Sequence, residues 1–98
     1  MFGLIVKFVT LEGSRDEFIR IMGAGFQDME GCHSYILAAD PADDTAVWLT
    51  EIWVDEESHD KSMADPRIKE VVAQVKPLLV RRDMRVVTEP RAGQGLSY

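Results

Sequence analysis

The sequence contains a single cysteine and no long apolar run, and each absence excludes a class of protein. Cys32 has no partner within the chain, so an internal disulfide is excluded and a cytoplasmic location is expected. The longest apolar run, Phe2 to Val9, is interrupted by Lys7 and is far shorter than the roughly 20 residues of a membrane span. Because this run also lacks a basic leader and a small-residue cleavage site, we do not expect a secretory signal.

Basic residues are scarce as well. The 98 residues include 17 Asp and Glu against 11 Lys and Arg, which gives a net charge of −6. A nucleic-acid partner is not expected, because phosphate binding needs a basic face. The composition, with 46% apolar residues, predicts one globular domain over residues 1–90 and a C-terminal tail over 91–98.

Standard catalytic and cofactor motifs are also missing. The sequence has no glycine-rich phosphate loop, no cysteine pair for zinc and no Gly-x-Ser-x-Gly elbow, so we expect neither metal nor cofactor. Asp40, Asp43 and Asp44 could bind a divalent cation, but a solvated hairpin tip is the favoured interpretation. Cys32 and His33 are interpreted as structural residues.

Hydrophobic periodicity and turn residues predict an alternation of strands and helices. Ser14 and Glu17 match a capping box ahead of a helical apolar stripe that continues to Met29, with Gly31 as a left-handed cap. Asp55 and Asp65 are expected to cap two further helices. The predicted strands are Phe2–Val9, Cys32–Ala39, Thr45–Val54 and Val80–Thr88, and the later helices run from Asp55 to about Met63 and from Pro66 to Lys76.

This order of elements, β-α-β-β-α-β, is the ferredoxin-like arrangement of the α+β class, with helices on one face of an antiparallel sheet. In the strand Thr45–Val54, apolar residues occupy both faces: Val47, Leu49 and Trp53 on one, Trp48, Ile52 and Val54 on the other. Two helices cover only one face of such a sheet, whereas an open face is normally polar. We therefore expect a second copy of the chain to cover the other face, in a homodimer.

Three residues close together in the sequence could carry chemistry. Glu51 is a carboxylate on the apolar face that Trp53 shares, and His59 lies on the helix that follows. A glutamate in apolar surroundings has a raised pKa and histidine titrates near neutrality, so the two could move protons beside an aromatic wall. The alternatives are that Trp53 is core, that His59 is a surface residue, and that Glu51 pairs with Arg82 or Arg85.

Three segments resemble the antibiotic biosynthesis monooxygenase family, in the family's order. Residues 30–35 with the following Asp40-Pro41 resemble its second strand, and Glu51-Ile52-Trp53 followed by His59 resembles its Glu-x-Trp and histidine block. Residues 68–79, with Pro77, are similar to the apolar helix and proline that come next. The resemblance covers residues 2 to about 88.

The resemblance implies a dimeric α/β barrel of ferredoxin-like protomers, each with a pocket between sheet and helices. Members include monooxygenases that oxidise quinols or anthrone-type aromatics with O2, without metal or flavin. Trp53 takes the place of a wall and N–H donor, His59 that of a substrate-contacting residue, and Glu51 that of the pocket carboxylate. The apolar residues expected to line the pocket and bind substrate are Leu49, Phe18, Met22 and Val72.

The chain also departs from some members of that family. Polyketide-oxidising and haem-degrading members have an asparagine four residues before the tryptophan, and this chain has Leu49 at that position. The haem-degrading branch has another asparagine, and Val6 falls near its position here. The second helical region lacks the haem-ligating histidine, so haem degradation is disfavoured. A non-catalytic ligand-binding or stress-related domain of the same fold is the alternative to a monooxygenase, and Leu49 favours it.

Overall fold

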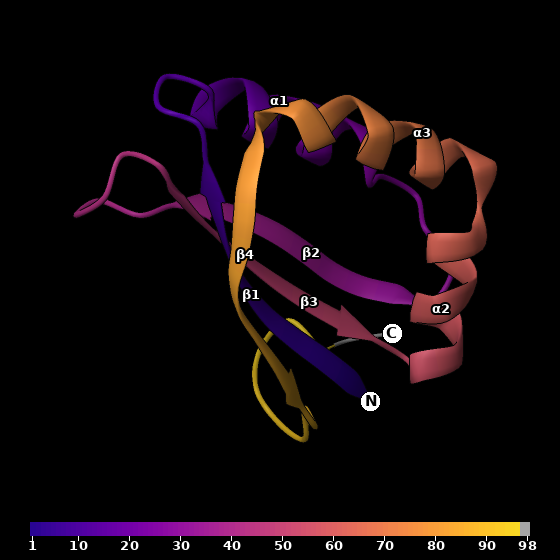
Figure 1. Ribbon diagram of the computed structural model, residues 1–98. Coiled ribbons are helices and arrows are strands. Elements are labelled where there is room, and N and C mark those ends of the chain that lie inside the picture. Colours follow the sequence, from indigo (N-terminus) through magenta and orange to yellow (C-terminus); the bar gives the residue numbers. More distant parts are fainter. Residues whose placement is uncertain (97–98) are drawn as a thin grey trace.

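The computed structural model describes residues 1–96 and contains a four-stranded antiparallel sheet with helices above one face (Figure 1). The strands lie in the order β2-β3-β1-β4, which confirms the ferredoxin-like arrangement predicted from the sequence. The elements are β1 (Phe2–Thr10), α1 (Arg15–Gly25), β2 (Cys32–Ala39), β3 (Ala46–Trp53), α2 (Glu56–Ala64), α3 (Pro66–Val75), the short 3-10 helix η1 (Lys76–Leu78) and β4 (Leu79–Thr88).

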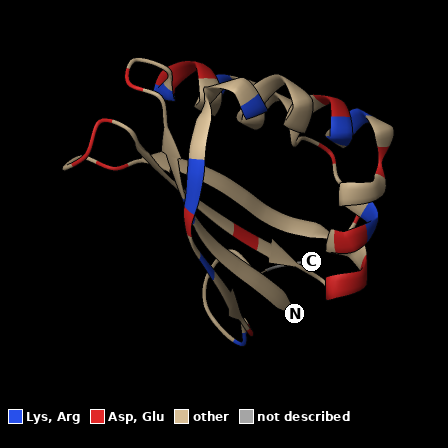
Figure 2. Cartoon of the chain, in the orientation of Figure 1, with Lys and Arg blue, Asp and Glu red and all other residues tan. Residues whose placement is uncertain are grey.

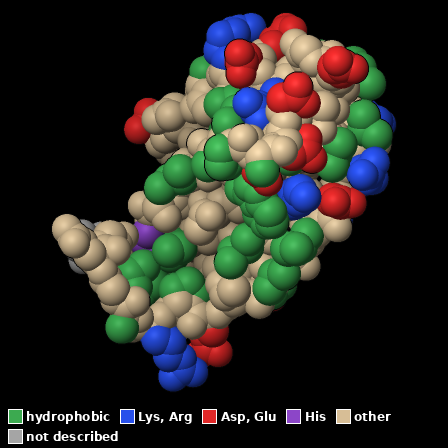
Figure 3. Space-filling model, turned by 90° about the vertical axis from the view of Figure 1, so that its left-hand side faces the viewer, with side chains coloured by type: hydrophobic (Ala, Val, Ile, Leu, Met, Phe, Trp, Pro, Cys, Tyr) green, Lys and Arg blue, Asp and Glu red, His purple; other side chains and the backbone are tan. Residues whose placement is uncertain are grey.

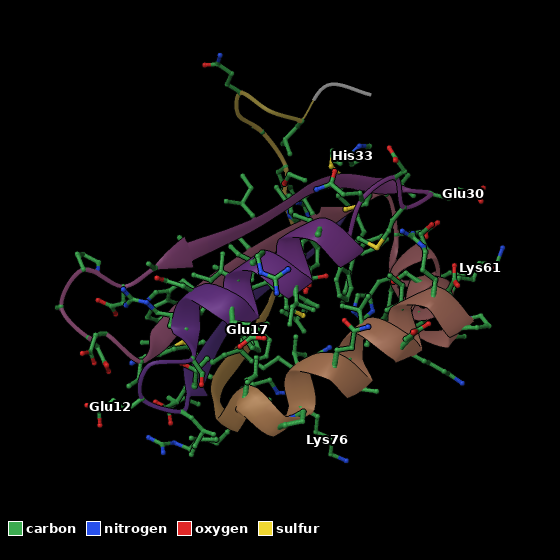
Figure 4. All side chains as sticks on the ribbon, turned by 90° about the horizontal axis from the view of Figure 1, so that it is seen from above. Glu12, Glu17, Glu30, His33, Lys61 and Lys76 are labelled. Carbon is green, nitrogen blue, oxygen red and sulfur yellow. The ribbon has the colours of Figure 1, made fainter. Side chains whose placement is uncertain are left out.

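Helices α1 and α3 lie side by side over the sheet, as the view from above shows (Figure 4), and the core fills the space between the layers. Phe18 and Met22 of α1 and Ile68 of α3 are buried there against Val47 of β3. The apolar stripes of the two helices and the alternation of β3 therefore meet in one layer, as their periodicities predict. No helix within residues 1–96 is long and apolar enough to cross a membrane.

The start of α1 differs from the sequence prediction. Ser14 occupies the N-cap position, but its side chain accepts no capping hydrogen bond and its backbone is in the helical region rather than extended. The backbone N–H of Ser14 instead donates to the carbonyl of Leu11, at 3.0 Å. The predicted capping box of Ser14 and Glu17 is therefore wrong, because the turn before the helix holds Ser14 in a conformation that aims its hydroxyl elsewhere.

The end of α1 also differs. The helix ends at Gly25 and does not reach Met29, because the chain turns and Asp28 adopts a positive φ of 53°. Phe26 and Met29 still pack against the core from the loop, which explains why their spacing resembles a helical stripe. Gly31 does have the left-handed φ expected of it, 80°, but it stands at the entrance to β2 rather than at a helix end.

The caps of the later helices are confirmed. The side chain of Asp55 accepts the backbone N–H of Ser58 at 2.8 Å, and that of Asp65 accepts the N–H of Arg67 at 2.8 Å. Pro66 occupies the first turn of α3, where its missing N–H costs no hydrogen bond. These caps define α2 as a separate short helix that follows β3. His59, one of the predicted site residues, is positioned by this helix.

The face of the sheet turned away from the helices is apolar. The strand register places one set of large apolar side chains on it: Ile5, Ile36, Trp48, Ile52, Met84 and Val86. Ile36, Met84 and Val86 are exposed. Figure 3 shows hydrophobic side chains gathered below the charged helix layer. This face, the open face hereafter, lacks the polar alternation of a solvated antiparallel sheet.

Two glycines of α1 give a matched test of how closely the helices pack. A Cβ at Gly25 would run into the side chain of buried Val71 on α3, whereas a Cβ at Gly23 would have only Leu37 near it, at 3.9 Å. We expect Gly25→Ala to lower the free energy of unfolding by about 1–3 kcal/mol through overpacking. Gly23→Ala should raise it by about 0.5–1 kcal/mol, because alanine favours the helix. Urea unfolding of both variants measures this, and equal effects would contradict the packing.

Candidate active site

A pocket of about 440 Å³ opens between the helix layer and the inner face of the sheet, the face toward the helices. Its floor is formed by all four strands, its roof by α1 and α3, and one end by α2. This volume is within the range of small-molecule sites, which are mostly apolar with a few polar groups. The polar or charged side chains among its lining residues are those of Tyr35, Glu51, His59, Lys76, Arg82 and Arg85.

Glu51 is the buried carboxylate of this pocket. It stands on β3 between Leu4 of β1 and Tyr35 of β2, and only 6% of its surface is exposed. Removal from water raises the pKa of Glu51 above its ordinary value, and this outweighs the opposing effects of the Trp53 hydrogen bond and of the electrostatic interactions with His59 and Arg85. Glu51 is therefore a better proton acceptor than an exposed glutamate once it is ionised.

Trp53 holds Glu51 in place. Its indole Nε1–H donates to Oε1 of Glu51 at 2.9 Å, and its ring is fully buried. Residues two apart on a strand share a face, so the hydrogen bond follows from the period of β3. Trp53 is not among the residues that line the pocket. The N–H expected to serve a ligand is donated to Glu51 within the protein, so Trp53 contacts Glu51 rather than the pocket.

His59 closes the end of the pocket near Glu51. Its ring lies edge-on to the indole of Trp53, with centroids 5.6 Å apart, and tilted against Phe2, with centroids 5.3 Å apart. Its Nδ1 lies 3.0 Å from a carboxylate oxygen of Asp60, an exposed residue. The structure therefore brings the three predicted residues together: Glu51 and His59 line the pocket, and Trp53 packs behind them.

The four apolar residues expected to bind substrate all line this pocket. Leu49 lies on its floor, Phe18 and Met22 face it from α1, and Val72 faces it from α3. Leu49, Phe18 and Met22 are buried, whereas Val72 is exposed and lies toward the opening. Helical spacing and strand alternation account for these inward positions, and the role of the four residues in binding substrate stays a prediction.

Other pocket residues could not be found as site residues from the sequence. Tyr35 stacks on Phe26 with ring centroids 4.5 Å apart, and burial followed by the charge of Glu51 raises its pKa. Its hydroxyl therefore stays protonated and can donate a hydrogen bond into the pocket. Arg82 and Arg85 line the pocket from β4, where no local motif marks them.

The other polar groups singled out from the sequence have structural surroundings. Burial raises the pKa of Cys32 to about 11, aided by the charge of Glu51, so its thiol is unreactive at neutral pH. Asp40 accepts hydrogen bonds from the N–H of Ala42 and the indole of Trp48, and Asp43 accepts from Thr45. Within residues 1–96, no group of three or more His, Cys, Asp or Glu side chains is arranged to hold a metal.

A second, polar cleft of about 330 Å³ lies between the 28–30 loop and the start of α3. Acidic and basic side chains both line it, among them Glu30, Lys61 and Arg67. The guanidinium of Arg67 donates to the carbonyls of Gly25 and Gln27, at 3.2 and 3.1 Å. Arg67 therefore ties the end of α1 to α3, and we assign this cleft a structural role.

The buried charge of Glu51 predicts a pH-dependent stability. Because its pKa is raised in the folded protein, the folded state holds a proton that the unfolded chain releases, so its contribution to stability falls as pH rises through the folded pKa. Glu51→Gln prevents this loss of stability, because glutamine carries no charge to bury at neutral pH. The glutamine oxygen can still accept a hydrogen bond from the Trp53 N–H. We expect the variant to be more stable than the original chain at neutral pH, with the difference shrinking toward pH 4. Urea unfolding at several pH values measures this, and a less stable variant at neutral pH would contradict it.

Comparisons with known proteins agree with the sequence resemblance. The family model described as antibiotic biosynthesis monooxygenase matches residues 1–74. The crystal structure of a candidate antibiotic biosynthesis monooxygenase from Chloroflexus aurantiacus J-10-fl is similar with a TM-score of 0.94 and 38% sequence identity, over 98% of each chain. No curated protein matches the chain at a significant level.

More distant structures share the fold alone. Rv0793 from Mycobacterium tuberculosis is similar with a TM-score of 0.78 and 22% identity, over 95% of this chain and 97% of that one. A conserved protein from Methanosarcina mazei Go1 gives 0.80 and 17%, over 92% of each chain. With the family model matching most of its length, this chain belongs to the antibiotic biosynthesis monooxygenase family.

Proposed function

We propose that this protein is a cofactor-independent monooxygenase that oxidises a small electron-rich aromatic, a quinol or an anthrone, with O2. The observation that carries the proposal is a buried carboxylate, Glu51, facing an apolar pocket large enough for such a molecule. An electron-rich phenol becomes a much stronger reductant when it loses its proton. The main contribution required of the protein is therefore a pocket that excludes water and contains a base to deprotonate the phenol.

The chemistry needs only the substrate, O2 and a proton acceptor. Glu51 takes a phenolic proton, and the phenolate gives one electron to O2 to form a semiquinone and superoxide. These two radicals combine into a ring peroxide anion, which takes the proton back from Glu51 and, as the hydroperoxide, loses water to leave a quinone bearing the new oxygen. For a hydroquinone, one substrate molecule and one O2 give one hydroxyquinone and one water, so atoms and electrons balance.

His59 and Tyr35 are the other groups suited to this reaction. Both line the pocket close to Glu51, His59 from α2 and Tyr35 from the neighbouring strand. Either could donate a hydrogen bond to the oxygen on which negative charge develops, a form of stabilisation that is strong in a pocket without water. Trp53 is a positioning residue, because its N–H holds the carboxylate of Glu51.

The alternative is a ligand-binding domain without catalysis. Leu49 favours it, because an apolar side chain lines the pocket floor at a position where the family resemblance implies a polar group in some members. This alternative predicts aromatic binding with no oxygen consumption, so the same assay separates the two functions.

We also propose that the protein is a homodimer that buries the open face. An interface of this kind needs about 2,000 Å² or more in total, and the apolar side chains of four strands are suited to supply it. The pocket lies on the opposite side of the sheet, so a partner packed on the open face leaves the pocket accessible.

Oxygen uptake with a panel of reduced quinols and anthrones tests the activity. We expect turnover above the rate of autoxidation with metal-free protein. Glu51→Gln and His59→Ala should each reduce kcat by roughly 100-fold or more if the two side chains move or stabilise the proton and charge. Trp53→Phe should lower kcat more than it raises KM, since it removes the N–H that orients Glu51.

The matched control for those variants is Glu57→Gln, a glutamate in the first turn of α2 that does not line the pocket. It should leave oxygen uptake unchanged. Binding of quinols with no uptake above autoxidation would support the non-catalytic alternative. Full activity in both Glu51→Gln and His59→Ala would place the chemistry elsewhere.

A charge on the open face tests the dimer. Val86 is 42% exposed, so Val86→Glu should leave the protomer folded but shift sedimentation from a dimer to an 11 kDa species at micromolar concentration. Leu11→Glu is the control, because Leu11 is similarly exposed, at 48%, but lies in the turn after β1, off the sheet. A stable monomer before any substitution would refute the dimer.

A further inference from the structure

We infer that the aromatic substrate carries an anionic group, best matched by a carboxylate, that Arg82 and Arg85 bind at the mouth of the pocket. This inference rests on the proposed function for the chemistry of the site, but it makes a separate statement about binding. Both arginines line the pocket from β4. They are among the basic residues that Figure 2 shows along that strand, in a chain of net charge −6.

A β-bulge places the two arginines on the same face. Arg85 and Arg82 are three residues apart, so in a regular strand their side chains would point to opposite faces. The register between β1 and β4 shifts at Asp83: Met84 aligns with Lys7, but Arg82 aligns with Phe8. Arg85 aligns with Val6, so both arginines occupy the inner face, over the pocket. Bulges frequently re-aim side chains beside functional sites.

Among the described residues, neither Arg82 nor Arg85 forms an ion pair or a side-chain hydrogen bond, whereas their neighbour Arg81 bonds Asp83 at 3.0 Å. The charge of Arg85 does act on Glu51 across the pocket and lowers the pKa of that carboxyl. Lys76 also lines the pocket, but Figure 4 shows it pointing outward from the end of α3. Two guanidinium groups that line one pocket and form no hydrogen bond or ion pair within the described part of the chain are suited to a carboxylate, which each can bind through two parallel N–H groups.

The register also separates the anion-binding end from the proton-accepting end. Glu51 aligns with Leu4, Arg85 with Val6 and Arg82 with Phe8, so the arginines stand roughly 7 and 13 Å further along the sheet than Glu51. They are also two strands away from it, roughly 10 Å across the sheet. A one- or two-ring aromatic fits between the two ends, with its phenol toward Glu51 and its carboxylate toward the arginines.

Anaerobic binding of a matched ligand pair tests this inference without requiring turnover. The probes are 2,5-dihydroxybenzoate and its neutral amide, 2,5-dihydroxybenzamide, titrated by calorimetry into the full chain. We expect the benzoate to bind at least tenfold more tightly, and this preference to weaken at high salt. The double variant Arg82→Gln, Arg85→Gln should bring the two dissociation constants within about twofold by weakening the benzoate alone.

Arg81→Gln is the matched control, because Arg81 aligns with Val9 on the other face and is paired with Asp83. It should keep the full preference. Equal binding of benzoate and amide by the original chain, or a preference that survives the double variant, would overturn the inference. Dissociation of a dimer by the double variant would also overturn it, by assigning the arginines to an interface. Absence of oxygen uptake with both probes would count against the monooxygenase only, since the binding preference is measured without oxygen.

Discussion

The hydrogen bond from the Trp53 indole to the buried carboxylate of Glu51 is the interaction on which the site depends. A carboxylate taken out of water is costly, and one donor only partly offsets that cost. The pKa of Glu51 is therefore raised even though Trp53, His59 and Arg85 all act to lower it. The Glu51 carboxylate nevertheless lies on a central strand beside a pocket. Such a position is typical of a functional group rather than of a structural one.

The rest of the molecule positions that carboxylate. Strand β3 is paired on both sides, so its backbone is fixed, and the caps at Asp55 and Asp65 hold α2 across the end of the sheet. His59 on α2 then packs against the Trp53 ring and closes one end of the pocket. At the other end, the bulge in β4 brings Arg82 onto the inner face beside Arg85. The pocket thus has a carboxylate end and a cationic end, joined by apolar side chains of the sheet and of the α1 and α3 helices.

The parts that the sequence predicts well are those governed by a simple period. Alternation in β3 correctly placed Glu51 with Leu49 and Trp53, and helical spacing correctly placed Phe18 and Met22 over them. Local geometry could not be read in the same way. Phe26 continues the helical spacing after the helix has ended, Ser14 has the residue type of a cap without its conformation, and the facing of Arg82 depends on a bulge that only the pairing with β1 reveals.

The most direct test is a carbon-detected NMR titration of the Glu51 carboxyl group together with the Trp53 indole N–H. An unperturbed glutamate titrates near 4.3. We expect the Glu51 carbon to titrate above that value, and the Trp53 Nε1–H resonance to shift with the same midpoint, since its acceptor changes charge. A Glu51 midpoint at or below the ordinary value, or an indole resonance that does not respond, would contradict a desolvated carboxylate held by Trp53 as the centre of the site.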